Sequence, residues 1–145
     1  NGISNGVKLV MFDNSDPNEL RQMGSVEILG SEDETSCISV YSEAQWERKA
    51  LMIAPEKNLI AVPICRNEYN YTSDSSYDRN EYYYVFFSYE NGEFVQRGTI
   101  EPDTDSSDTG FNRAIYIGEY VYVVVNNTIT SADIETFTVT DSVTF

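Results

Sequence analysis

A six-residue motif occurs twice in this chain, with a weaker third copy, and it constrains the fold more than any other feature. QMGSVE at residues 22–27 aligns with QRGTIE at 96–101, and more weakly with TDSVT at 140–144. Each copy follows an apolar segment and a polar turn, in VMFDNSDPNEL, FFSYENGEF and TITSADIETF. The step from Thr99 to Ser142 is 43 residues. This repeat predicts that one supersecondary unit is used several times along the chain.

Short segments rich in β-branched and aromatic residues predict strands, because turn residues separate them. The predicted strands are residues 7–12, 24–29, 50–54, 59–65, 82–89, 94–101, 114–117, 120–125 and 136–140. Asn91-Gly92 lies between two of them and is a strong hairpin signal, since both residues tolerate the positive φ of a tight turn. Only residues 43–50 have a helix-forming composition. The sequence therefore predicts an all-β fold of antiparallel strands.

The step of the repeat matches the ~40 to 45 residues of a four-stranded propeller blade. We therefore interpret residues 1–145 as a single all-β unit, a partial β-propeller of about two and a half antiparallel four-stranded blades. Residues 6–29 supply the outer strands of one blade, 44–102 form a second blade with an inserted loop at 66–81, and 111–145 form a third. A closed ring needs ~4 to 8 blades, so blade faces are left uncovered. The expected partners are the preceding propeller blades of a parent protein or a second copy of the chain.

The aromatic segment EYYYVFFSY at residues 81–89 does not alternate between apolar and polar residues. A strand with one face in water alternates, whereas a strand buried on both faces is apolar throughout. We therefore favour a doubly buried strand over an aromatic platform for a ligand.

Composition limits the classes of partner. The chain has 24 acidic and 9 basic residues and a net charge of −15, which disfavours nucleic acids and anionic membranes. No segment approaches the ~20 apolar residues needed to cross a bilayer, so we expect no membrane insertion. The chain begins at Asn1 without a leader, and we expect a mature or excised fragment. Cys37 and Cys65 allow either one disulfide or two separate thiols.

Four segments carry a resemblance to a known family. They are GVKLVMFDNSDPNEL (6–20), GSVEI (24–28), YSEAQWERKALMIAPEKNLIAVPI (41–64) and RAIYIGEYVYVVVNNTITSADIET (113–136). In this order they resemble the C-terminal part of secreted bacterial proteins that carry a C-terminal β-propeller domain. The resemblance implies a propeller, an extracellular or cell-surface location and no established activity. Where that family has a histidine-containing stretch, this chain has WERK at 46–49, so no role of an imidazole carries over.

The chain contains no histidine, which excludes histidine-based nucleophile activation and imidazole zinc sites. Paired carboxylates could still hydrolyse glycosides. The candidate acids near predicted strand ends are Glu43, Asp103, Asp105, Asp108 and Glu119. Asp103, Asp105 and Asp108 offer hard oxygens at closely spaced positions, so the alternatives for this segment are a calcium site and a solvated turn between blades. No other cofactor is expected.

Tyrosines in the polar insert at 66–81 are candidate ligand contacts, because loops on a rigid scaffold carry most binding residues. They are Tyr69, Tyr71 and Tyr77, and Trp46 is a fourth candidate. Tyrosine among serine and asparagine gives adaptable contact area, although a surface loop without a partner is the alternative. We expect a non-catalytic binding or scaffolding module that contacts an extracellular protein or glycan. The alternative is part of a carbohydrate-active propeller enzyme.

Overall fold

The computed structural model describes residues 5–32, 36–70, 78–102 and 112–145, and the paired strands in these ranges are all antiparallel. Their bounds are β1 (Gly6–Asp13), β2 (Arg21–Leu29), β3 (Ser31–Glu32), β4 (Ser36–Tyr41), β5 (Met52–Ala54), β6 (Leu59–Asn70), β7 (Asp78–Glu90), β8 (Glu93–Ile100), β9 (Asn112–Ile117), β10 (Tyr120–Val125), β11 (Thr128–Asp133) and β12 (Val139–Thr144). Three single 3₁₀ turns accompany them: η1 (Glu43–Gln45), η2 (Arg48–Ala50) and η3 (Pro55–Lys57). The predicted all-β class is confirmed.

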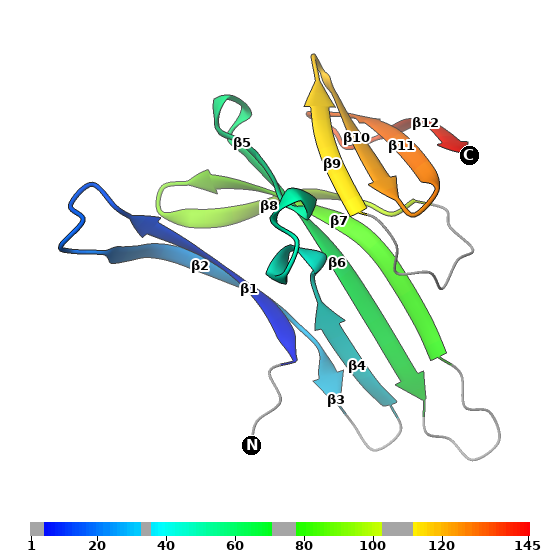
Figure 1. Ribbon diagram of the computed structural model, residues 1–145, viewed down its shortest axis with the longest axis horizontal. Coiled ribbons are helices and arrows are strands. Elements are labelled where there is room, and N and C mark those ends of the chain that lie inside the picture. The colour runs from blue at the N-terminus through cyan, green and yellow to red at the C-terminus, as the bar shows by residue number, and fades with distance from the viewer. Residues whose placement is uncertain (1–4, 33–35, 71–77, 103–111) are drawn as a thin grey trace.

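The strands form three sheets, which lie side by side (Figure 1). The first sheet is the hairpin β1–β2. The second sheet has the order β3–β4–β6–β7–β8, with β5 paired to the start of β6. The third sheet has the order β9–β10–β11–β12. The four strands β5–β8 fall within residues 44–102 and β9–β12 within 111–145, which is consistent with a partial β-propeller, while the limits of the folding units stay a prediction.

Each copy of the sequence motif carries a β-bulge at the same position. In the first sheet, Met11 pairs with Gly24 and Phe12 with Gln22, so Met23 has no counterpart. Arg97 in β8 and Thr140 in β12 are left out in the same way. A bulge bends its strand and increases the local twist. The three last strands are therefore equivalent in backbone geometry as well as in sequence.

Strand β7 is buried on both faces, as the aromatic segment predicted. Its even-numbered residues Tyr82, Tyr84 and Phe86 belong to a core between the second and third sheets. Val85 and Phe87 belong to a second core, which lies between the second sheet and the first. Full burial of a large apolar side chain stabilises a fold by ~1.5 to 3 kcal/mol. β7 therefore joins the three sheets.

The structure corrects the prediction that residues 66–81 form an inserted loop. β6 continues to Asn70 and β7 begins at Asp78, so only residues 71–77, which lie outside the described ranges, connect them. Ion pairs support this polar ladder: the guanidinium of Arg66 lies 2.9 Å from Glu81, its partner across the strands, and 3.4 Å from Glu68. Cross-strand pairs of opposite charge stabilise a sheet without any apolar pattern. Strand β4 then covers the free edge of the extended β6.

Two local predictions also change. A strand was predicted at 136–140, but β12 begins at Val139, because Phe137 has a positive φ of 56° in a turn before it. The carboxylate of Asp133 accepts the backbone N–H groups of Glu135 and Thr136 and holds that turn. The helix-forming segment 43–50 forms only the two turns η1 and η2.

Candidate binding site at Trp46

The segment between β4 and β5 presents Trp46 to solvent. Ser42 begins η1 with a capping box, in which its hydroxyl accepts the N–H of Ala44 and its own N–H reaches the side chain of Gln45. Glu47 begins η2, and its carboxylate accepts the N–H of Lys49 at 2.9 Å. Side-chain caps of this kind fix the ends of short turns. Trp46 lies between the two turns with 68% of its surface exposed.

A small pocket opens beside Trp46. Its volume is about 90 Å³, and its lining residues are Tyr41, Glu43, Trp46, Pro63, Ile64, Cys65, Tyr82 and Asn112. The rings of Tyr41 and Trp46 stack, with centroids 6.2 Å apart and planes inclined by 29°. Pockets that enclose a drug-sized ligand are ~300 to 1,000 Å³. This pocket therefore suits an edge or substituent of a ligand whose remainder lies over the exposed indole.

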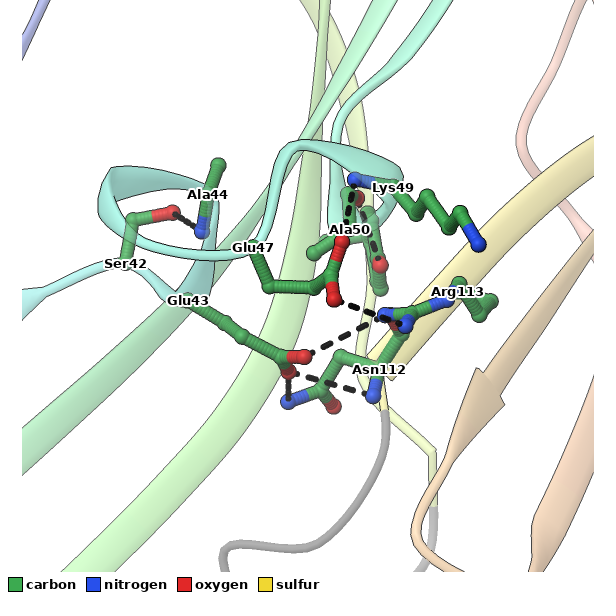
Figure 2. Close-up of polar contacts among 9 residues, drawn as sticks. Ser42, Glu43, Ala44, Glu47, Lys49, Ala50, Asn112 and Arg113 are labelled. Atoms are coloured by element: carbon green, nitrogen blue, oxygen red, sulfur yellow. Dashed lines mark hydrogen bonds and ion pairs between the residues drawn. The ribbon is translucent and has the colours of Figure 1, made fainter.

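Glu43 joins the pocket to the third sheet (Figure 2). One of its oxygens accepts the backbone N–H of Asn112 at 3.2 Å and its side-chain amide at 2.7 Å, and the other accepts from Arg113 at 3.2 Å. Glu47 lies 3.7 Å from the other end of the same guanidinium. The side chains of Glu43 and Arg113 are 14% and 19% exposed, so this contact is largely withdrawn from water. It holds the start of β9 against the segment that carries Trp46.

Four groups in or beside the pocket have shifted pKa values. A hydrogen bond from the N–H of Lys49 lowers the pKa of Glu47, and Arg113 lowers it further. Desolvation raises the pKa of Tyr41 to about 12 and also raises the pKa of Tyr82. Burial raises the pKa of the Cys65 thiol, which donates to the side-chain oxygen of Asn67 at 3.0 Å. Glu47 is thus a carboxylate, while the two phenols and the thiol are neutral hydrogen-bonding groups and poor nucleophiles.

The sequence-predicted ligand contacts do not come together in the described part of the chain. Tyr69 is 40% exposed and lies on β6 opposite Cys37 and Asp78, four residues beyond Cys65, which is ~13 Å along a strand. Tyr71 and Tyr77 lie outside the described residues. Of the two candidates that lie in the described ranges, Tyr69 does not line the pocket, whereas Trp46 does. Its neighbours Tyr41, Cys65 and Tyr82 come from three separate strands, and only the pairing register, which puts Cys65 opposite both Tyr41 and Tyr82, reveals them.

The candidate calcium ligands Asp103, Asp105 and Asp108 also lie outside the described residues, so that site stays a prediction. Within the described ranges, no group of three or more Asp, Glu or Cys side chains is arranged to hold a metal ion. The same ranges contain no helix with the length and apolarity required to span a membrane.

The two cysteines are free thiols. On the β4–β6 ladder, Cys37 lies opposite Tyr69, whereas Cys65 lies opposite Tyr41. Four residues of strand, about 13 Å, therefore separate them, and a disulfide needs Cα atoms within ~7 Å. Of the two alternatives that the sequence left open, the structure has the separate thiols.

Comparison with known proteins agrees with the repeated sheets. No curated protein and no solved structure matches the chain. The family model described as beta propeller domain matches residues 1–137, nearly the whole chain. With its three packed antiparallel sheets and a bulge repeated in each, the chain belongs to the β-propeller domain family.

Proposed function

We propose that this chain is a non-catalytic binding and scaffolding module, formed by the C-terminal blades of an exported bacterial β-propeller protein. Membership of the propeller family supports a scaffold built from packed blades. The resemblance in the segments 6–20, 24–28, 41–64 and 113–136 supports an extracellular or cell-surface location. The Trp46 pocket supports a binding role, because rigid sheets on both sides of it position its walls.

The proposed ligand is a neutral or weakly basic glycan. The observation that carries this proposal is the exposed indole of Trp46 beside a pocket lined by Glu43, Asn112 and two tyrosines. A sugar ring presents C–H groups on its faces and hydroxyls on its edge. The indole suits the apolar face, while the carboxylate, amide and phenols suit the hydroxyls. A net charge of −15 disfavours an acidic polysaccharide.

The alternative, a glycoside hydrolase, needs one carboxyl group with a raised pKa to act as general acid and a second as nucleophile or base. Among the described residues that line the pocket, Glu43 is the one acid, and it is held by Asn112 and Arg113. Glu47, which shares Arg113, has a lowered pKa. This arrangement favours binding over hydrolysis.

The scaffolding role is proposed from the first sheet, which has two strands in the described part of the chain, whereas a blade has four. A groove of about 410 Å³ lies between β1 and the second sheet. Its lining is mainly apolar and includes Leu9, Leu51, Ile60 and Phe94. Exposed apolar grooves of this kind mark contact surfaces. We propose that the inner strands of the same blade, supplied by the preceding part of a parent protein, lie in this groove beside β1.

Titration of the chain against a panel of neutral polysaccharides and their oligosaccharides by calorimetry tests the ligand. Trp46→Ala is expected to weaken binding about fivefold, since an aromatic contact contributes ~1 kcal/mol. Trp46→Phe is expected to restore part of the affinity. Ile117→Ala, which removes another exposed apolar side chain on the third sheet, is the matched control and should bind like the wild type. Equal affinities of wild type and Trp46→Ala would contradict the proposal, as would a panel without any binding.

A further inference from the structure

In the first and second sheets, the residue that follows the bulge is the point where the next sheet docks. A Cβ at Gly24 in β2 would lie 2.4 Å from the carbonyl oxygen of Gly92, in the β7–β8 turn of the second sheet. A Cβ at Gly98 in β8 would lie 2.7 Å from the ring of Phe137, in the β11–β12 turn of the third sheet. Glycine lets the backbones approach this closely. The two sheet-to-sheet contacts are therefore of the same kind: in each, the last turn of the following sheet packs against the glycine after the bulge.

In the third sheet an acidic residue, Asp141, stands at the position of this glycine. The register pairs Ser131 with Asp141 immediately before the bulge, as it pairs Phe86 with Gly98 in the second sheet. Asp141 is exposed, and its carboxylate accepts the N–H of Ser142 at 2.8 Å. A side chain with a negative charge thus occupies the docking point, and an aromatic turn cannot rest there as Phe137 rests on Gly98.

This face also carries exposed apolar side chains. Ile115, Ile117 and Val143 on the outward face of the third sheet are 52%, 61% and 56% exposed. Val143 is equivalent to Ile100 of the second sheet, two residues after the docking glycine, and Ile100 is fully buried beneath the third sheet. A sheet face of this composition is suited to cover by another sheet.

The charge of the turn that meets Asp141 decides which sheet can cover this face. Arg97, the bulged residue of β8, lies 3.6 Å from Glu135 in the last turn of the third sheet, so the existing contact already includes one ion pair across the sheets. A second copy of this chain would bring its own β1–β2 turn to Asp141. That turn contains Asp16 and Glu19, and its Arg21 already pairs with Asp13 at 3.1 Å. Like charges would meet, which disfavours the second copy.

We propose that the outward face of β9–β12 is covered by a further four-stranded blade whose last turn carries a lysine or arginine that pairs with Asp141. Asp141 thus selects the neighbouring blade by charge, at the position where the contacts of the first and second sheets have Gly24 and Gly98. This inference concerns the opposite side of the third sheet from the Trp46 pocket and holds whether or not that pocket binds a glycan.

Charge exchange within the chain tests the selection. Asp141→Lys creates the complement of the acidic β1–β2 turn, so copies of this variant are expected to associate head to tail. Sedimentation equilibrium should give a higher average mass for Asp141→Lys than for the wild type at low salt, and the difference should disappear at ~1 M salt, where the Debye length is about 3 Å. The variant Asn14→Lys/Glu19→Lys, in which the turn is basic, should associate through the native Asp141.

Combining the two changes should return the mass to that of the wild type, because both surfaces are then basic. Glu56→Lys, which alters an exposed acid on η3, is the control for net charge and should not associate. The proposal is overturned if Asp141→Lys and the basic-turn variant keep the mass of the wild type, or if Glu56→Lys associates equally. A wild-type chain that self-associates and is dissociated by Asp141→Lys would also overturn it. Circular dichroism of each variant verifies that the sheets are intact.

Discussion

The hydroxyl of Tyr84, in the middle of the doubly buried strand β7, donates to the backbone oxygen of Ala50 at 2.9 Å. Both residues have no exposed surface. The hydrogen bond joins β7 to η2, and thus to the segment that carries Trp46. Burial raises the pKa of Tyr84, so the phenol stays a donor.

Tyr84→Phe is expected to lower the free energy of unfolding by ~1 to 2 kcal/mol, because the carbonyl of Ala50 is left buried without a partner. Urea denaturation followed by circular dichroism measures the change. Tyr122→Phe, in a partly exposed position on the third sheet, is the control and should change stability by less than about 0.5 kcal/mol. Equal stability of Tyr84→Phe and the wild type would show that the bond contributes nothing.

Gly98→Ala is expected to destabilise the chain by ~1 to 3 kcal/mol, because the new methyl group meets the ring of Phe137 at 2.7 Å. Phe137→Ala alone leaves a cavity and also destabilises. In the double variant the alanine methyl has room, so the two effects should fall short of their sum when measured by urea denaturation. Strict additivity in this double-mutant cycle would indicate that the two residues do not contact each other.

Glu43→Ala should destabilise the chain more than the double variant Glu43→Ala/Arg113→Ala does. Glu43→Ala removes the nearer of the two carboxylates at the largely buried guanidinium of Arg113, since Glu47 lies 3.7 Å away and Glu43 only 3.2 Å. We expect a loss of ~2 to 4 kcal/mol, of which Glu43→Ala/Arg113→Ala recovers part, since the largely buried guanidinium is then removed together with Glu43. Thermal unfolding of the two single variants and the double variant measures this. A double variant less stable than Glu43→Ala would argue against the ion pair as the cause.

Alkaline pH should destabilise the fold through the tyrosines of the pocket. Desolvation raises the pKa of Tyr41 from about 10 to about 12 in the folded state, and Tyr82 shifts in the same direction. A group with a raised folded-state pKa contributes stability that is complete below pH ~10 and is lost as the pH rises through 12. Urea midpoints measured between pH 8 and 12 should therefore fall, and less steeply in Tyr41→Phe. Parallel curves for the two proteins would show that Tyr41 does not cause the loss.

The two thiols should differ in reactivity. Cys37 is partly exposed, whereas Cys65 is buried and has a raised pKa. A chromogenic disulfide reagent should modify Cys37 first and Cys65 mainly after urea is added, because the thiolate is the reacting form. Cys37→Ser and Cys65→Ser assign the two phases. A single phase in the folded chain, with both thiols modified together, would contradict the burial of Cys65.

The repeat predicted the strand–turn–strand unit that ends in β2, β8 and β12. It could do so because these three strands share a backbone feature, the bulge before Gly24, Gly98 and Asp141. Apolar patterns predicted the strands that lie between sheets, including β7. The extended ends of β6 and β7 were missed because cross-strand ion pairs such as Arg66–Glu81 hold them, and such pairs leave no apolar period in the sequence.

The pocket was only partly predictable. Trp46 was among the candidate ligand contacts, but its pocket neighbours Tyr41, Tyr82 and Asn112 come from β4, β7 and β9. Their convergence depends on the register of two ladders and on the packing of the third sheet against the second. Neither the register nor the packing can be predicted from short segments of the sequence, since register follows from long-range pairing.

The position of β7 in both cores also bears on how the chain unfolds. Separation of the third sheet would expose Tyr84, Phe86 and Ile100, and separation of the first sheet would expose the opposite face of the same strand. Either loss weakens the hydrophobic contacts that keep β7 between β6 and β8. We therefore expect the three sheets to unfold together in a single cooperative transition, with equal calorimetric and van't Hoff enthalpies. This is expected although the sequence consists of repeats, which in other proteins can unfold separately.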